Sequence, residues 1–400
     1  MIVVGGTYIE ECDWPEWTRL MGPGVRAALA LSEVSPQTEL YSYANDAVIE
    51  DLRSTMLTSG LATPQVRTRE EKVAYSYKHP LSYPRRTPKL EETPDDSAAP
   101  QLSESWSVKG DTVLAFRLQE TKIVVSAKRA VFELSQQDEE IERGDIGKLA
   151  LIAAENDFPQ AAANVQDFAA QTMPAHNANL LIFRWQSGGG ILFDGEMEHS
   201  IPAYVANEWF KIGTGNIFCA MFAHYWGEQN MDAMAAADLA SRCSAYYAGS
   251  RALPIPVSQN LPDMEKFDPT ADCKIFIASP CISMAQQWLV DEAIRTFEML
   301  RIQTVTPYDL GLDGVSRKNV DVGRVLDGCS AVLVLAEGAD LPSVLAVGLA
   351  RVRKLPIVVL AEESREPRVS LWQGTDCEIA RDFASAVYRA MVAGKRRPAG

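Results

Sequence analysis

Short apolar runs alternate with amphipathic segments along much of this 400-residue chain. In the C-terminal third the alternation is regular. Each apolar run is short enough for a buried strand, and each segment between two runs repeats its apolar residues at helical spacing. This pattern predicts an α/β domain built on a parallel sheet with helices on both faces. The predicted strands are residues 273–278, 304–308, 331–336 and 356–361, and the predicted helices are 284–301, 320–329, 341–353 and 376–393.

The N-terminal part carries the same two patterns less regularly. Met1–Gly6 predicts a short strand that ends in glycines, and Gly22–Glu33 predicts a glycine turn followed by a helix. Thr38–Leu61 predicts a strand, a turn and an amphipathic helix. The remaining predicted elements are two strands within residues 112–130, a strand at 180–185 and a helix at 231–247.

A stretch without periodicity separates the two parts. Gly249–Asp272 holds four prolines and residues of mixed polarity, which is typical of a linker. We therefore expect one domain at residues 1–248, a linker at 249–272 and a second domain at 273–400. Tyr83–Ser105, rich in proline, acids and small residues, is expected to be a surface loop.

Composition restricts the class of protein. Hydrophobic residues make up 47% of the chain and charged residues 23%, as in soluble globular proteins. We expect neither a membrane span nor a signal peptide, because no apolar stretch approaches about 20 residues and no basic segment opens the chain. A net charge of −15 disfavours direct binding to nucleic acid. Seven scattered cysteines suggest reduced thiols in the cytoplasm, and four histidines without ligand spacing predict no zinc site.

The stretch with most chemical content is KIGTGNIFCAMFAHY, residues 211–225. Gly213 and Gly215 flank Thr214, and Asn216 then opens an apolar run with helical spacing. A glycine turn at a helix start leaves backbone N–H groups unpaired. Together with the helix dipole, these donors suit an anionic phosphate. The alternative is an ordinary tight turn before a core helix.

This stretch resembles the GAGD signature of the ribokinase-like (PfkB) family of sugar and nucleoside kinases. Gly22–Glu33 and Thr38–Leu61 resemble that family's glycine turn and its strand–loop–helix. The resemblance implies a three-layer ribokinase-like domain with an anion hole at the glycines, and Mg and ATP or another nucleotide as cofactors. In that family an aspartate deprotonates the acceptor hydroxyl. Asn216 stands at its position, and an amide cannot take up a proton at neutral pH.

The resemblance departs from the kinase pattern at a second position. Where the family has an asparagine three residues before a glutamate, this chain has Ala154 if Asp157 is aligned with the glutamate. We therefore expect this domain to bind a nucleoside, nucleotide or sugar phosphate without efficient phosphoryl transfer. A carbohydrate or nucleoside kinase with unusual base chemistry is the alternative enzyme, and a ligand-sensing scaffold is the non-catalytic alternative. The glycines at 188–190 either face a nucleotide or form a plain hairpin turn.

Polar residues gather at the predicted carboxyl ends of the C-terminal strands, which is where parallel sheets bind ligands. A binding cleft is therefore expected there, and solvated loop acids are the alternative reading of the carboxylates. The candidate catalytic or ligand-binding residues are Ser279, Pro280, Tyr308, Asp309, Glu337, Gly338 and Asp340.

The segments KIFIASP, TPYDLG and VLVLAEGAD, with the helix that follows, resemble the nucleoside 2-deoxyribosyltransferase family, whose core is Rossmann-like. The resemblance implies cleavage of an N-glycosidic bond in a nucleoside, a nucleotide or NAD. Glu337 and Gly338 stand at the family's DG position, and Ala346 stands at the position of its catalytic glutamate. An alanine can neither attack nor stabilise the anomeric carbon. This half is therefore expected to be inactive as written, whether the alanine is natural or replaces a glutamate.

The same resemblance bears on assembly. Domains of this family often complete their site from a neighbouring subunit, so a homo-oligomer is expected. A ligand-binding domain fused to a glycosidase suits a regulated effector, with a regulatory partner protein and, by analogy, a role in bacterial antiphage defence. Nucleosides or nucleotides are the expected small-molecule ligands.

Overall fold

The computed structural model divides into two compact units. Unit 1 comprises Met1–Ala206 and Phe210–Lys266, and unit 2 comprises Asn207–Trp209 and Phe267–Gly400. No helix in the described part of the chain is long and apolar enough to cross a membrane. The residues that the structure describes are 1–88, 103–118, 121–135, 141–280, 282–306, 309, 322–336, 341–362, 372 and 376–396.

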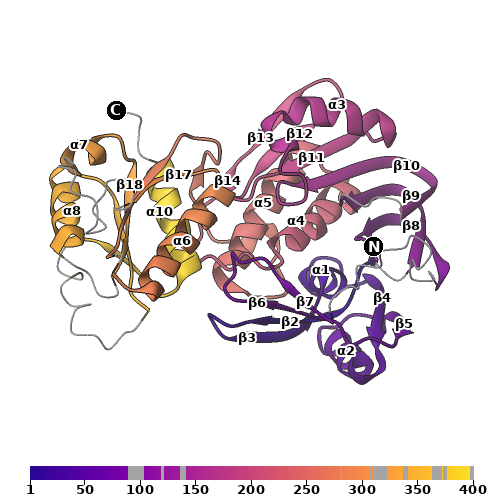
Figure 1. Ribbon diagram of the computed structural model, residues 1–400. Coiled ribbons are helices and arrows are strands. Elements are labelled where there is room, and N and C mark those ends of the chain that lie inside the picture. Colours follow the sequence, from indigo (N-terminus) through magenta and orange to yellow (C-terminus); the bar gives the residue numbers. More distant parts are fainter. Residues whose placement is uncertain are drawn as a thin grey trace, which may run out of the picture. The chain divides into compact units, whose positions relative to one another are not determined.

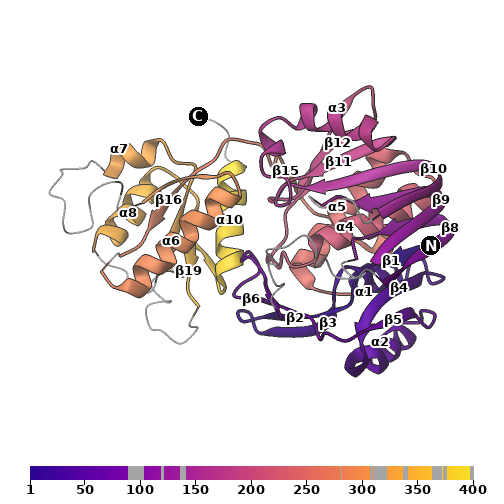
Figure 2. The same ribbon diagram turned by 45° about the vertical axis from the view of Figure 1, so that its right-hand side comes forward.

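Unit 1 is built on a nine-stranded sheet, which Figures 1 and 2 show in two views turned by 45°. The strand order is β13-β12-β11-β10-β9-β8-β1-β4-β5. Neighbours from β5 to β11 pair in parallel, and β12 and β13 extend the sheet in antiparallel fashion. The strands are β1 (Ile2–Val4), β4 (Glu39–Asn45), β5 (Gln65–Arg69), β8 (Ser103–Ala115), β9 (Thr121–Glu133), β10 (Ile141–Ala154), β11 (Leu180–Arg184), β12 (Gly190–Phe193) and β13 (Glu198–Ile201).

A second sheet of four short strands accompanies the large one, in the order β3-β2-β6-β7. None of these strands was expected from the sequence, because their side chains are largely half-exposed and give no apolar run. The strands are β2 (Tyr8–Cys12), β3 (Trp17–Met21), β6 (Ala74–Tyr77) and β7 (Arg85–Thr87), and the two-residue strands β14 (Ala203–Tyr204) and β15 (Lys266–Phe267) occur later in the chain.

Four helices of unit 1 share one hydrophobic core with the large sheet. Pro23 opens the first of them, where its missing N–H costs nothing. Asn45 caps the second by accepting a hydrogen bond from the Ala47 amide at 3.0 Å. These two helices and the turn before each agree with the sequence expectation. The helices are α1 (Pro23–Leu31), α2 (Asp46–Thr58), α4 (Thr214–Phe222), which continues as a π-helical turn at Ala223–Glu228, and α5 (Ala233–Ser250).

Three long strands fold back over the other face of this sheet. Val4 of β1 pairs with both Ala115 of β8 and Tyr41 of β4, so these residues lie at one level. A straight β8 would carry Trp106 roughly 30 Å away from that level, because a strand rises about 3.3 Å per residue. Instead the ring of Trp106 lies 5.5 Å from that of Tyr41 and 5.3 Å from that of Tyr43. The first half of β8 therefore packs on the sheet, and β9 and β10 stay paired beside it.

The same face also receives α3 (Val165–Ala175), through Val165, Ala169 and Met173. A 3-10 turn at Ala161–Ala163 precedes this helix. Downstream, Gly188 and Gly189 have positive φ angles, and the turn they form brings β12 back to pair with β11. The triple glycine therefore makes a hairpin turn.

The end of unit 1 is packed rather than extended. α5 runs as far as Ser250, beyond the start of the predicted linker. The Ile255 side chain is fully buried, and its amide donates to the carbonyl of Ala30 at 3.2 Å. Leu261 is also buried, after a 3-10 turn at Ser258–Asn260.

Unit 2 contains the parallel sheet that the sequence predicts, in the order β17-β16-β18-β19-β20. In chain order this is 2-1-3-4-5, a doubly wound arrangement of the flavodoxin type. The expected α/β fold class is therefore confirmed. The elements are β16 (Lys274–Ala278), α6 (Met284–Met299), β17 (Gln303–Val305), α7 (Val322–Asp327), β18 (Ala331–Leu335), α8 (Leu341–Val352), β19 (Ile357–Leu360), β20 (Glu378–Ala380) and α10 (Phe383–Lys395).

The prediction of one helix across residues 376–393 is wrong at its start. Glu378–Ala380 forms the fifth strand, paired with β19. The helix begins only at Phe383, because the Asp382 side chain caps it and accepts from the Ser385 amide at 2.8 Å.

Candidate functional site

The glycine stretch of the sequence forms the start of α4. Gly213 is the N-cap residue, with a φ angle of +80° that favours glycine. A Cβ at this position would lie 2.1 Å from Nε of Arg26, so the close approach of that side chain also excludes any larger residue. The first turn of the helix follows. The Thr214 amide donates to the carbonyl of Lys211 at 3.1 Å, whereas the amides of Gly215 and Asn216 are at positions that lack intrahelical partners. Gly213, Thr214, Gly215 and Asn216 thus form the start of α4 as consecutive residues, and the Asn216 side chain binds Arg26.

A buried guanidinium lies against this helix start. Arg184 is the last residue of β11 and is 9% exposed. Its Nη1 lies 3.0 Å from the place where Gly215 would carry a Cβ, and its guanidinium carbon lies 4.6 Å from the ring centre of Phe218. Nε of Arg184 has no hydrogen-bond partner within the described residues. Burial lowers the pKa of Arg184 from its ordinary value. This side chain therefore places a hydrogen-bond donor beside the N-terminal end of α4.

A lysine adds a second cation. Lys211 lies three residues before Thr214, and its carbonyl accepts from the Thr214 hydroxyl at 2.9 Å. Loss of hydration lowers the pKa of Lys211 to about 7, and the positive charge of Arg184 contributes to this shift. A lysine with this pKa changes its charge near neutral pH, and an anion bound nearby would favour its protonated form.

Two carboxylates complete the group. Glu133 ends β9, and its Oε1 would lie 3.7 Å from a Cβ on Gly215. Burial raises the pKa of Glu133 to about 7, with a contribution from the negative charge of Asp157. Burial also raises the pKa of Asp157 to about 6, against the attraction of Lys211 and Arg184. These side chains stand at or just beyond the carboxyl ends of parallel strands, where such sheets bind ligands.

We call Gly213, Gly215, Arg184, Lys211, Glu133 and Asp157 the α4 site. It combines the N–H groups of Gly215 and Asn216, which lack intrahelical partners, with two cations and with two carboxylates whose pKa values are raised toward neutrality. Strongly shifted pKa values in one cluster are typical of functional sites. The arrangement can hold an anion such as phosphate, and it can hold or release protons near pH 7.

Asn216 faces a different group. Its Oδ1 accepts from Nη1 of Arg26 at 2.9 Å, and Arg26 in turn binds Glu10 through both carboxylate oxygens. Nε of Arg26 donates to the hydroxyl of Tyr247 at 3.2 Å. Burial works against the charge of Arg26, but the carboxylate of Glu10 raises its pKa above the ordinary value. The amide of Asn216 is thus tied to a permanent cation in the core.

Sequence reasoning missed Arg26, Glu10, Arg184, Lys211 and Glu133. Two of these residues, Arg184 and Glu133, could have been found from the sequence. Arg184 follows the apolar run LLIF, and Glu133 follows AVF, so each places a charge directly at the carboxyl end of a buried strand. Ala154 is the last residue of β10 and Asp157 follows it. Arg26 carries no comparable signal, because its partners are distant in the sequence.

The candidates in unit 2 have local roles where they are described. Ser279 is buried and its hydroxyl donates to the carbonyl of Pro280 at 3.0 Å. Asp309 accepts hydrogen bonds from the amide and the hydroxyl of Thr306, at 2.8 and 2.9 Å. Ala346 is 2% exposed and lies in the apolar core of unit 2. Tyr308, Glu337, Gly338 and Asp340 lie outside the described residues.

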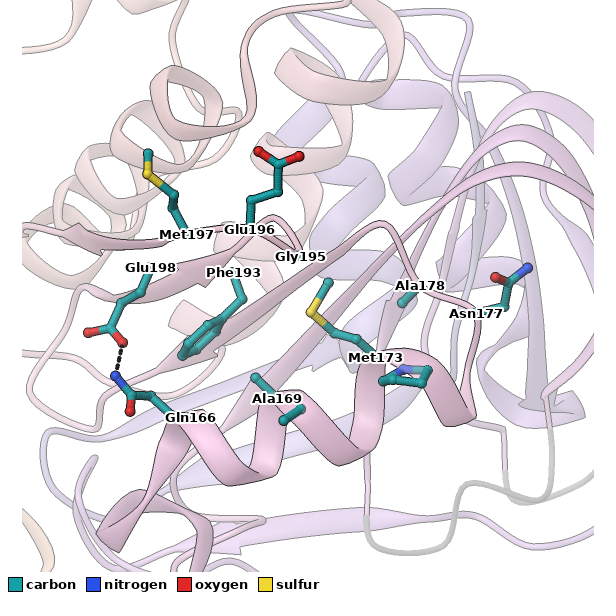
Figure 3. Close-up of a pocket in the computed structure, with 12 residues that line it drawn as sticks. Gln166, Ala169, Met173, Asn177, Ala178, Phe193, Gly195, Glu196, Met197 and Glu198 are labelled. Atoms are coloured by element: carbon teal, nitrogen blue, oxygen red, sulfur yellow. Dashed lines mark hydrogen bonds between the residues drawn. The ribbon is translucent and has the colours of Figure 1, made fainter.

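A pocket of about 600 Å³ lies elsewhere in unit 1, between α3 and the β12–β13 hairpin. Figure 3 shows Met173 and Phe193 in its wall, with Gln166 bonded to Glu198 at 2.7 Å. Phe193 pairs with Leu181, near the amino end of β11, whereas Arg184 is at the carboxyl end. The pocket and the α4 site are therefore at opposite ends of the same strands.

Comparisons with known proteins find similarity among solved structures. No protein-family model matches the chain, and no curated protein matches it. A pyrophosphate-dependent kinase of the ribokinase family, complexed with a pyrophosphate analog and myo-inositol, is 10% identical with a TM-score of 0.42, covering 64% of this chain and 97% of its own. A mutant phosphofructokinase-2 from Escherichia coli is 11% identical with a TM-score of 0.43, and the match covers 65% of this chain and 97% of the phosphofructokinase chain.

A third similar structure is ribokinase from Arabidopsis thaliana, complexed with ribose and ATP. It is 15% identical with a TM-score of 0.42, covering 66% of this chain and 95% of its own. The likeness to ribokinase-family structures thus extends over about two thirds of the chain, while a deoxyribosyltransferase-like domain is not shown.

Proposed function

We propose that unit 1 binds a small phosphorylated molecule, a nucleotide or a sugar phosphate, with a phosphate group at the α4 site. The observation that carries this proposal is the buried Arg184, whose Nη1 lies beside Gly215 and whose Nε has no partner within the described residues. A buried guanidinium donor without a partner is costly, and an anion would supply the missing acceptor. Lys211 and the helix N–H groups would add further donors to the same anion.

The bound molecule acts as a regulator rather than a substrate for phosphoryl transfer. Transfer needs a group that takes the proton of the acceptor hydroxyl. The amide of Asn216 cannot do so, and its oxygen already accepts from Arg26. Glu133 and Asp157 are the carboxylates that would hold a magnesium ion together with the phosphates, since magnesium usually takes one or two protein carboxylates. When bound, that ion would offset phosphate charge.

A kinase is the second candidate, and one observation favours it. Glu133 has a pKa of about 7 and lies at the start of α4, so its carboxylate could take up a proton near neutral pH. In this case Glu133 would replace the base that Asn216 cannot be. Formation of ADP or release of phosphate with sugar or nucleoside acceptors, abolished by Glu133→Gln, would favour this candidate over the regulator.

Titration calorimetry with sulfate tests the anion site on the full chain. Sulfate keeps its charge between pH 6 and 8, so any pH dependence belongs to the protein. We expect tighter binding at pH 6 than at pH 8, because Lys211 gains its charge and Glu133 loses its own across this range. Arg184→Met should weaken binding by about tenfold or more, the worth of a charge-assisted hydrogen bond. Lys72→Met, at an exposed lysine of unit 1, is the matched control.

The same titration separates the ligand classes. The affinities of ADP, AMP and ribose 5-phosphate are compared with that of sulfate. The compound that binds most tightly shows which group besides the phosphate the protein recognises. If sulfate and all three phosphorylated compounds bind Arg184→Met as well as the unchanged protein, the phosphate is not at the α4 site.

For unit 2, cleavage of an N-glycosidic bond is part of this proposal only in a form that carries glutamate at position 346. What supports it is the placement of Ser279 and Asp309 after the neighbouring parallel strands β16 and β17. With alanine at 346 we expect no cleavage. The effector role in antiphage defence stays an analogy that follows from this activity.

A further inference from the structure

Helix α8 of unit 2 is apolar on both of its sides. Ala346 and Ala350 on the inner side are buried in the core. The residues of the outer side recur at intervals of three and four, which places them along one stripe of the helix. This outer stripe consists of Leu341 (85% exposed), Val344 (52%), Leu345 (58%), Gly348 and Val352 (80%).

An exposed stripe of this kind is unusual on a surface helix. Helices of soluble domains normally turn polar or charged residues outward, and a helix that is apolar all round is normally buried. The five residues of the stripe are uncharged, and two arginines near the end of the helix are engaged within unit 2: Arg351 bonds Asp376 at 2.9 Å, and Arg353 bonds Asp327 at 2.6 Å. The stripe therefore presents an apolar surface without a net charge that would repel an identical surface.

We propose that the outer stripe of α8 binds the same stripe of a second copy of this chain, with the two helices antiparallel. The stripe is complementary to itself in that direction. When two copies are related by a twofold axis between Ala346 and Val347, Leu341 of one faces Val352 of the other, and Leu345 faces Gly348. A Cβ built on Gly348 meets no atom within 4 Å, so the space above Gly348 is open and the leucine of the partner can approach the helix backbone there.

Such a pair is favourable in two further respects. A twofold axis is the commonest symmetry of soluble oligomers and makes both partners use the same patch. Antiparallel helices also place opposite ends of their dipoles side by side. The stripe exposes on the order of 450 Å² in each chain, which approaches the roughly 1,000 Å² total of a specific interface before any polar rim is added. The surface is thus large enough to form the centre of a dimer contact.

Mass measurement across a concentration series tests whether the stripe causes association. Light scattering or sedimentation of the full chain should show a dimer that dissociates on dilution. Leu345→Lys should shift the dissociation constant upward by at least a hundredfold. Leu57→Lys is the matched control, because Leu57 is 76% exposed on α2 and should leave association unchanged. Circular dichroism shows whether each variant is folded.

Paired charges test the direction of the helices. Leu341→Glu alone and Val352→Lys alone each place a charge against an apolar partner, so each should dissociate the dimer. The double variant Leu341→Glu/Val352→Lys places opposite charges face to face in an antiparallel pair and should regain it. A wild-type chain that stays monomeric at all concentrations overturns the proposal, as does a folded Leu345→Lys variant that still dimerises. A double variant that does not recover excludes the antiparallel arrangement.

Discussion

Arg26 and Asn216 lie 190 residues apart in the sequence and meet in unit 1, where Nη1 of Arg26 donates to Oδ1 of Asn216 across 2.9 Å. Arg26 also holds both carboxylate oxygens of Glu10. The residue that the sequence resemblance aligns with a catalytic base is thus an amide that is fixed to a cation.

Asn216→Asp should therefore not create an efficient kinase. An aspartate at this position would lie beside the guanidinium of Arg26, which would hold its pKa low and make it a poor proton acceptor. We expect ADP formation with sugar and nucleoside acceptors to stay at background in a coupled assay. Asn216→Ala is the control for the hydrogen bond and should lower the free energy of unfolding by about 1 kcal/mol. A large rise in turnover for Asn216→Asp would contradict the proposal that unit 1 binds its ligand as a regulator.

The ion pair of Glu10 and Arg26 gives a prediction about stability. Arg26 is 1% exposed and Glu10 is 5% exposed. Glu10→Gln leaves a buried guanidinium without its carboxylate and should cost about 3–5 kcal/mol in the free energy of unfolding. The double change Glu10→Leu/Arg26→Met removes both charges and should cost clearly less than the single change. Urea unfolding of unit 1 measures both, and additive losses in the double variant would show that the pair is not coupled.

The sequence predicted best those elements whose apolar residues repeat regularly. Strands β18 and β19 are all-apolar runs, β16 is apolar after Lys274, and the α6 segment repeats its apolar residues at helical spacing, so their types followed from local pattern. β20 was missed because a three-residue strand at a sheet edge has too few apolar positions to differ from a helix start.

The folded-back strands and the α4 site could not be predicted in the same way. The contact of Trp106 with Tyr41 and Tyr43 depends on a reversal within β8. Gly110 and Asp111 in the middle of this strand are a local turn signal, but they do not show onto which strands the chain folds back. GTGN predicted the helix start, but the cations that make it an anion site come from β11 and from Lys211. Their convergence is a property of the sheet order rather than of any segment.

The raised pKa of Glu133 makes the stability of the protein depend on pH. With a pKa of about 7 in the folded protein, against an ordinary value near 4.5, the folded state binds more protons than the unfolded state between these two values. The contribution of Glu133 to stability is therefore most favourable below pH 4.5 and is lost as the pH rises to 7. We therefore expect the free energy of unfolding of Glu133→Gln, measured relative to that of the wild type, to increase by roughly 1–3 kcal/mol when the pH rises from 5 to 8.

Thermal or urea unfolding at pH 5, 6, 7 and 8 measures this difference. Asp167→Asn on α3 is the matched control, since Asp167 is exposed in the first turn of that helix. A difference between Glu133→Gln and wild type that is constant over this range would show that the carboxyl group of Glu133 titrates normally.

Position 346 gives the test of chemistry in unit 2. Ala346 is 2% exposed, so a glutamate placed there would be partly desolvated and its pKa raised. A carboxyl group in this state can donate or accept a proton near neutral pH, as glycoside cleavage requires. We expect Ala346→Glu to release free base from a nucleoside or a nucleotide, or nicotinamide from NAD, as followed by chromatography. Ala346→Gln should have the same bulk, disturb the core to a similar extent and release nothing. If circular dichroism shows both variants folded and neither releases product, with or without a ligand at the α4 site, unit 2 is not a glycosidase.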